Sequence, residues 1–267
     1  MPKVKVNTMN IYYEIYGTGP PLLMILGLGA NITWWGKYFT KGLADYFKVI
    51  VFDNRGTGQS INPKSQYTIK TLADDAYSLL KALNIENTFV FGHSMGGGIA
   101  QELIILYSRS IGMSKLILCS SSCGGSKSIL ASPEVLQIIN KTRSGRTPIE
   151  IAKESLKIFY SPEFMKNNPK LIDYAVQNMA KSQMFSRNYE WQTTAIKSFK
   201  TCDRIKNIKI PTLIMHGAKD VLVPPQNTKI LAELIPNAHI KMFTESAHAP
   251  YVEEPDAVID AMVEFLL

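Results

Sequence analysis

The chain has 267 residues, of which 46% are hydrophobic and 19% charged, and its formal net charge is +7. This length and composition fit one large α/β domain or two small ones, and they exclude a disordered or low-complexity chain. The longest apolar run, around residues 21–30, is far shorter than the roughly 18 residues that cross a membrane. Because the N-terminus also lacks an apolar signal core, we expect a cytoplasmic protein without a membrane partner.

Short apolar runs alternate with helical patterns along the chain, which predicts an α/β fold with a mostly parallel sheet. The first two segments alternate polar and apolar residues, and they predict an antiparallel pair at a sheet edge. The later runs are continuously apolar, as expected for strands buried on both faces. Expected strands cover residues 3–9, 11–16, 22–26, 49–52, 88–91, 115–119, 212–215 and 239–243. Expected helices cover residues 72–83, 99–108, 228–234 and 255–267.

Residues 125–205 break this rhythm, because they contain amphipathic helical patterns but no good buried strand. We interpret this interval as a helical cap inserted into a core that comprises residues 1–124 and 206–267. A helical segment between core strands is most simply a lid over a site, and we favour that interpretation over a packing buttress.

The positive charge of the chain is concentrated in the same region. Residues 126–210 hold 15 Lys and Arg against 7 Asp and Glu, a balance of +8. A solvated, lysine-rich helical surface explains this better than a patch that steers anionic ligands, although the second interpretation stays open. Nucleic-acid binding is not expected, because no recognition motif accompanies the charge.

The three cysteines, Cys119, Cys123 and Cys202, are odd in number and scattered. This argues against a disulfide framework, and no second Cys or His pair stands at metal-ligand spacing. We therefore expect three reduced packing residues and no metal site.

The segment Gly92-His93-Ser94-Met95-Gly96 lies between an apolar run and a helical pattern. A serine between two glycines at a strand-to-helix junction is typical of a nucleophile elbow. The turn is so tight that side chains two positions before and after the serine would collide. A serine that only caps the helix would need neither flanking glycine. We therefore predict that Ser94 is a nucleophile.

A serine hydroxyl needs a base to take its proton, and the chain has four histidines. His93 is adjacent in the turn and should point away from the hydroxyl. His216 and His239 lie in or at the edges of expected strands, where a structural role is favoured. His248 lies in a loop after the last strand, where a base can be displayed. We predict His248 as the base.

The base in turn needs a carboxylate to hold its tautomer. Asp220 follows the expected strand at residues 212–215, and it stands between Ser94 and His248 in chain order. This order, Ser then Asp then His, is that of α/β-hydrolases. Asp53, which follows an earlier strand, is interpreted as a turn residue. We predict Asp220 as the acid.

These motifs together resemble the α/β-hydrolase superfamily, in its esterase and lactonase branch with a helical cap. The resemblance covers nearly the whole chain and is weakest in the cap. It rests on residues 26–29, 53–60, 92–96, 216–224 and 248–250. The chain departs from many relatives by having Leu26-Gly27 in place of His-Gly, and Ala247 in place of glycine.

The resemblance implies an eight-stranded, mostly parallel sheet flanked by helices, with an inserted helical cap. It also implies an oxyanion hole made by the backbone N–H groups of Leu28 and Met95, and no catalytic role for residues 53–60. Relatives that open epoxides or cleave carbon–halogen bonds carry an aspartate at the elbow, so Ser94 favours acyl transfer to water.

The expected function is therefore that of a carboxylesterase for small or medium esters, with no cofactor and no nucleic-acid partner. Trp34, Trp35 and Trp191 are candidates for an apolar substrate pocket, and core packing is an equal alternative for each. Other functions stay open. They are an enol-lactonase or a carbon–carbon bond hydrolase with an anionic substrate, a peracid-forming esterase, and a non-catalytic binding protein. The sequence leaves the oligomeric state open, including a homodimer.

Overall fold

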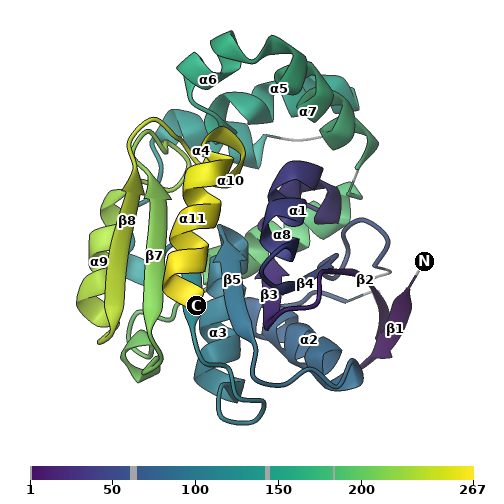
Figure 1. The fold of residues 1–267 in the computed structure, drawn as a ribbon. Coiled ribbons are helices and arrows are strands. Elements are labelled where there is room, and N and C mark those ends of the chain that lie inside the picture. Colours follow the sequence, from purple (N-terminus) through teal and green to yellow (C-terminus); the bar gives the residue numbers. More distant parts are fainter. Residues whose placement is uncertain (1, 61–64, 142–144, 183) are drawn as a thin grey trace.

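The computed structural model describes residues 2–60, 65–141, 145–182 and 184–267. Within these residues an eight-stranded sheet has the order β1-β2-β4-β3-β5-β6-β7-β8 (Figure 1). The pairs β1–β2 and β2–β4 are antiparallel, and all the other pairs are parallel. This arrangement confirms the mostly parallel sheet with an antiparallel edge that the sequence predicts. The strands are β1 Lys3–Val6, β2 Met9–Tyr16, β3 Pro21–Ile25, β4 Lys48–Phe52, β5 Phe89–His93, β6 Leu116–Cys119, β7 Thr212–Gly217 and β8 Ala238–Phe243.

The helices of the core include the four that the sequence predicts, and α1 and α10, which it does not. No helix in the described part of the chain is long and apolar enough to span a bilayer. The helices of the core are α1 Lys37–Ala44, α2 Ile69–Ala82, α3 Met95–Tyr107, α9 Gln226–Leu234, α10 Pro250–Glu253 and α11 Pro255–Leu266, with short 3₁₀ turns η1 Ile32–Trp35, η2 Gly125–Lys127 and η3 Ile205–Asn207.

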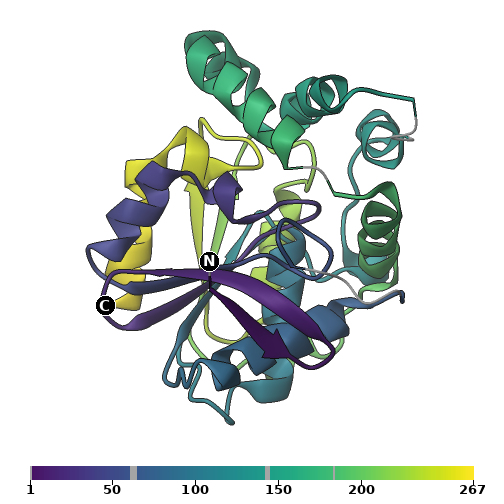
Figure 2. The ribbon, with the colours of Figure 1, turned by 90° about the vertical axis from the view of Figure 1, so that its right-hand side faces the viewer.

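The central strands are buried on both faces, which explains their continuous apolar runs. In β3, Leu23 and Ile25 face a core shared with α2, α3 and α9. The alternate residues Leu22 and Met24 face a second core shared with α1 and α11. The sheet therefore lies between two layers of helices (Figures 1 and 2).

The described residues between β6 and β7, in the interval that the sequence marks as a cap, form five α-helices. Helices α5 and α7 pack on each other through a small core of their own, formed by Ala152, Leu156 and Val176. Both views show α5, α6 and α7 at one end of the sheet, with α8 beside the core (Figures 1 and 2). The five helices are α4 Pro133–Asn140, α5 Pro148–Phe159, α6 Pro162–Asn167, α7 Pro169–Lys181 and α8 Ser186–Ser198.

A disulfide joins Cys123 to Cys202, with a Cα–Cα distance of 5.0 Å across a sequence separation of 79. The expectation that all three cysteines are reduced is therefore wrong for these two, whereas Cys119 is free and buried. The two ends of the inserted segment meet at an antiparallel bridge between Gly124 and Lys200. Neither the number nor the spacing of cysteines reveals such a meeting.

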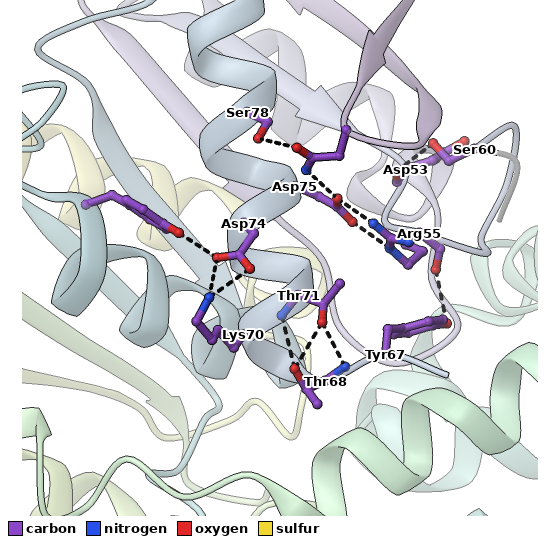
Figure 3. A network of polar contacts seen from close by, with 12 residues as sticks. Asp53, Arg55, Ser60, Tyr67, Thr68, Lys70, Thr71, Asp74, Asp75 and Ser78 are labelled. Atoms are coloured by element: carbon purple, nitrogen blue, oxygen red, sulfur yellow. Dashed lines mark hydrogen bonds and ion pairs between the residues drawn. The ribbon is translucent and has the colours of Figure 1, made fainter. Parts of the chain in front are cut away.

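The turn after β4 is held by contacts to the core. Both carboxylate oxygens of Asp53 accept backbone N–H groups, Oδ1 from Ile32 at 2.9 Å and Oδ2 from Gln59 at 2.7 Å. Figure 3 shows the neighbouring ion pair, in which Arg55 Nε and Nη2 contact the carboxylate of Asp75 on α2 at 2.7 and 2.6 Å. These contacts are those of a structural turn, as expected for Asp53.

Candidate active site

Ser94 lies in a strained turn between the end of β5 and the start of α3. Its φ of 57° and ψ of −123° are unusual for a residue with a side chain. A Cβ on Gly92 would overlap the Gly96 carbonyl oxygen, and a Cβ on Gly96 would overlap the Ile25 carbonyl oxygen. The two glycines therefore allow the strand and the helix to meet closely at the serine. The Ser94 side chain makes no helix-capping hydrogen bond, so capping does not explain its position.

The helix that follows begins at Met95, four residues earlier than the sequence predicts. The first N–H groups of a helix have no acceptor within the helix, and they carry its positive dipole end. The Ser94 main chain is held by a hydrogen bond from its N–H to the Cys119 carbonyl at 2.9 Å. In addition, Ser121 Oγ donates to the Ser94 carbonyl at 3.0 Å. The helix start at Met95 therefore places the first N–H groups of α3 directly after Ser94, and one of them, that of Gly97, donates to the Ser94 carbonyl at 2.9 Å.

His248 and Asp220, the predicted base and acid, are in direct contact. His248 Nδ1 lies 2.8 Å from Asp220 Oδ2, and both side chains are buried. Asp220 Oδ1 accepts the backbone N–H groups of Leu222 at 2.8 Å and Val223 at 2.9 Å. Burial acts to raise the pKa of Asp220, but the charge of His248 and the hydrogen bonds from His216 and His248 outweigh it, so the pKa lies well below its usual value. Asp220 is therefore an anion aimed at His248.

The same carboxylate oxygen has a second histidine partner. His216 Nε2 lies 3.0 Å from Asp220 Oδ2, and His216 Nδ1 lies 2.9 Å from the hydroxyl of Thr228. Both contacts are satisfied when His216 Nε2–H donates to Asp220 and Nδ1 accepts the Thr228 proton. The structural role predicted for His216 thus includes support of the candidate acid, which its position in a strand does not reveal.

His248 Nε2 is a buried nitrogen without a hydrogen-bond partner among the described residues. This is the atom through which a triad histidine accepts the serine proton. No hydrogen bond in the described ranges joins it to Ser94 Oγ. Catalytic hydrogen bonds are often long without substrate and tighten when it binds. The structure thus brings two of the three predicted residues into contact and leaves the nitrogen for the third available.

The loop after β3 approaches Ser94 from the other side. A Cβ on Gly27 would lie 2.9 Å from Ser94 Cβ and 3.2 Å from Ser94 Oγ, so a side chain at this position would crowd the hydroxyl. In the described part of the chain, the N–H of the next residue, Leu28, has no hydrogen-bond partner. Gly27 and Ser94 therefore lie close together. The predicted oxyanion-hole donors are the N–H groups of the residues that follow them, Leu28 after Gly27 and Met95 after Ser94.

A cavity of about 730 Å³ opens at Ser94 and extends between the sheet and the helices α4, α5, α7 and α8. Trp34 and Phe159 line this cavity, and their rings meet edge to face at 5.9 Å. Most of the other lining residues are apolar. The lining also includes cap residues that the sequence analysis does not name, among them Leu130, Leu136, Ile151, Tyr174 and Met179.

The other two tryptophans assigned to the pocket do not line this cavity. Trp35 is 1% exposed and packs against Phe91 and Tyr251, with ring centroids at 5.2 and 5.0 Å. Trp191 packs against the ring of Tyr67, with a centroid distance of 6.0 Å. The contacts of both are those of core packing, which is the alternative interpretation for each. Neighbours such as Trp34 and Trp35 point in different directions, which composition cannot resolve.

A family model described as the alpha/beta hydrolase fold matches residues 20–255. The chain belongs to the α/β-hydrolase fold family. One relative, a candidate carbamate hydrolase of Azorhizobium caulinodans, is 27% identical over 99% of this chain and 98% of its own. A solved thermophilic esterase from Thermogutta terrifontis is 26% identical, with a TM-score of 0.82 over 100% of this chain and 98% of that chain. A solved enol-lactonase from Burkholderia xenovorans LB400 shares the fold, with 23% identity and a TM-score of 0.85 over 99% of both chains.

In this α/β hydrolase, His93 contacts the loop that carries His248. Its Nε2 lies 2.9 Å from the His248 carbonyl oxygen, and the two rings are 4.8 Å apart. Burial, followed by the charge of His248, lowers the pKa of His93 from 6.5 to about 3. His93 therefore stays neutral and donates its proton to the main chain of His248. Among the described residues of the hydrolase, no cluster of three His, Cys, Asp or Glu side chains could hold a metal ion.

Because His93 is buried and neutral, we expect the folded hydrolase to lose stability in acid. Between pH 6.5 and about 3 the unfolded chain binds a proton on His93 and the folded hydrolase does not, so acid favours unfolding. We expect His93 to contribute up to about 1.4 kcal/mol per pH unit across this window. Urea unfolding of wild type and His93→Asn at several pH values measures this contribution. Equal pH slopes for the two proteins would assign the acid sensitivity to other groups.

Proposed function

We propose that this α/β hydrolase is a serine carboxylesterase. Ser94 Oγ attacks the ester carbonyl while His248 Nε2 takes its proton, and Asp220 holds the imidazole and stabilises its charged form. The alcohol leaves with a proton from His248, and water then releases the acid by the same steps in reverse. The observation that carries this proposal is the strained Ser94 elbow, whose preceding residue, His93, contacts His248 of the buried His248–Asp220 pair.

The oxyanion of the intermediate would be bound by the N–H groups of Leu28 and Met95. Both belong to the main chain next to Ser94, and such donors act strongly because they are fixed before the reaction begins. The departure at Leu26 does not affect these donors, since they are backbone groups.

The largely apolar cavity supports a carboxylic ester with an apolar acyl or alcohol group as the substrate. Its volume, about 730 Å³, is within the roughly 300–1,000 Å³ of pockets that enclose drug-sized ligands. A series of esters with increasing acyl length is the direct measurement, and the esterase among the solved relatives supports this choice of substrate.

We also propose that residues 125–205 act as a lid over the site. The cap reaches the candidate base directly, because the His248 N–H donates to the Phe159 carbonyl at the end of α5, at 3.0 Å. Glu253 adds a second link, since one carboxylate oxygen accepts the Ala247 N–H at 2.8 Å and the other accepts the Ser161 N–H at 2.9 Å. Movement of α5 would therefore shift the main chain at His248.

An anionic substrate, such as an enol-lactone, is the second candidate, and one observation favours it. Lys141, Arg146 and Lys197 line the cavity together with one acidic residue, Glu154. Glu154 is paired with both Lys141 and Arg146, so these three residues retain one net positive charge. At low salt, anionic esters should then gain in kcat/KM over neutral esters of equal size, and no gain would remove this candidate.

The central test compares wild type and Ser94→Ala on a chromogenic short-chain ester. We expect the substitution to lower kcat by at least about 10³-fold, because the nucleophile is lost while binding groups remain. A serine-directed phosphonate should label wild type at Ser94 and leave the variant unlabelled. Equal turnover by the two proteins would exclude Ser94 as the nucleophile. An absence of both turnover and labelling in wild type would favour a non-catalytic binding protein.

A further inference from the structure

The oxyanion loop, defined as residues 26–30 between β3 and η1, carries few side chains that could hold it in place. Gly27 and Gly29 provide none, and the Leu26 side chain is buried and apolar. At Gly29, where φ is +70°, a Cβ would meet only the Tyr189 ring, at 3.6 Å. Glycines lose the most conformational freedom when they are ordered, so the position of this loop depends on its hydrogen bonds.

Two buried amide side chains supply those hydrogen bonds, one at each end of the loop. Asn54, which follows β4, donates from Nδ2 to the Leu26 carbonyl at 2.9 Å. Gln192, on the cap helix α8, accepts the Gly29 N–H on Oε1 at 2.8 Å. Gln192 is fully buried, and its Nε2 lies 3.4 Å from the Arg55 carbonyl in the turn after β4. Gln192 therefore links the cap to the loop by a buried hydrogen bond.

These bonds determine which N–H groups of the loop are free. Gln192 occupies the N–H of Gly29, and the N–H of Ala30 contacts the Gly27 carbonyl at 3.4 Å. In the ranges that the structure describes, Leu28 N–H is left without an acceptor, in a loop whose Gly27 lies against Ser94. The amide held by Gln192 is the next one along the chain. A shift of Gly29 would therefore rotate the Leu28 peptide.

We propose that Gln192 is a positioning residue of the oxyanion hole, through which cap helix α8 fixes the Leu28 N–H relative to Ser94. This inference rests on the proposed function, since it concerns the oxyanion of the acyl-transfer reaction. Gln192 does not touch the substrate in this scheme. It binds the N–H group of Gly29, and the position of Gly29 sets the direction of the Leu28 N–H group, which is the donor one residue earlier.

Asn188 provides a matched control on the same helix. It lies one turn before Gln192, it is also buried, and its Nδ2 donates to the Gly56 carbonyl at 3.1 Å. That acceptor belongs to the turn after β4 and not to the oxyanion loop. Loss of the Asn188 bond should weaken the attachment of α8 to the core without disturbing the Leu28 peptide.

The experiment compares wild type with Gln192→Met, which keeps the length of the side chain but has no strong acceptor, and with Asn188→Leu. A milder variant, Gln192→Asn, keeps the carboxamide but is one methylene too short to reach Gly29, and it serves if Gln192→Met does not fold. For each protein kcat and KM are measured on a chromogenic ester. The affinity of a boronic acid is measured too, because its adduct on serine places an oxygen in the oxyanion hole.

For both Gln192 variants we expect kcat to fall about 10- to 100-fold, since a donor displaced by about 1 Å loses much of its effect. KM should stay within about threefold, because the ground-state ester depends little on this donor. Boronic-acid affinity should fall with kcat. Asn188→Leu should keep kcat within about twofold of wild type and lose only stability.

Two results would overturn the inference, and they are distinguishable. If wild type turns over ester while the Gln192 variants match Asn188→Leu in kcat and in boronic-acid affinity, Gln192 has no positioning role and the proposed function stands. If wild type shows neither turnover nor phosphonate labelling, the proposed function and this inference fail together.

Discussion

Replacing Asp220 by asparagine is expected to lower kcat about 10⁴-fold while leaving the fold intact. Asp220 Oδ2 faces ring nitrogens of both His248 and His216, and Oδ1 accepts two backbone N–H groups. An asparagine can keep its oxygen toward the main chain, but its NH₂ group then faces His248 Nδ1. Because that group donates and cannot accept, His248 would be forced into the tautomer that carries its proton on Nε2, where it cannot act as a base.

The measurement is kcat on a chromogenic ester, with circular dichroism and urea unfolding as checks of the fold. Asp53→Asn is a matched control, since Asp53 is also a buried carboxylate bound by two backbone N–H groups at the end of a strand. The kcat of Asp53→Asn should stay within a few fold of the wild-type value. A kcat for Asp220→Asn close to that of wild type would place the acid elsewhere.

Gly96→Ala is expected to disrupt the nucleophile elbow and to lower the free energy of unfolding by about 3 kcal/mol or more, at the upper end of overpacking effects. The added methyl group would overlap the Ile25 carbonyl oxygen, which belongs to the central strand β3 and cannot move aside. Helix α3 would have to shift away from the sheet, and Ser94 with it. We therefore expect phosphonate labelling at Ser94 to be lost, even where the variant stays folded.

Gly98→Ala is the matched comparison, two residues along the same helix. There the methyl group would lie 3.0 Å from the tip of the Phe199 ring, a side chain that can shift by a few tenths of an ångström. Alanine is favoured over glycine in a helix by up to about 1 kcal/mol, which offsets the cost of moving the ring. The stability of Gly98→Ala should stay within about 1 kcal/mol of wild type. Equal stability losses at the two positions would contradict a specific requirement at Gly96.

Prediction from the sequence worked where a local pattern determines the structure. The buried parallel strands are continuous apolar runs, and the elbow needs Gly92 and Gly96 whatever the rest of the chain does. Helix α1 was missed because its eight residues include Gly42 and bury only Phe39, Thr40 and Leu43. A helix this short depends on tertiary packing more than on its own propensity.

The site was predictable only as a set of residue types in chain order. The contact of His248 with Asp220 confirms the pairing of those two residues. Features that depend on distant segments were not accessible. The bond from Gln192 to Gly29 spans 163 residues, and the disulfide between Cys123 and Cys202 spans 79. Composition also does not say which way a side chain points, and of the three tryptophans only Trp34 is among the residues that line the cavity.

The ends of the inserted helical segment are held together independently of what lies between them. Cys123 and Cys202 have Cα atoms 5.0 Å apart, and Gly124 and Lys200 form an isolated antiparallel bridge beside them. Strands β6 and β7, which the segment connects, are themselves neighbours in the sheet. The segment is therefore attached to the core at its two ends, which the disulfide and the bridge hold together. Helices of another length or lining could replace it between the two cysteines without displacing a strand, so the lining of the cavity can change while Ser94, Asp220 and His248 stay in place.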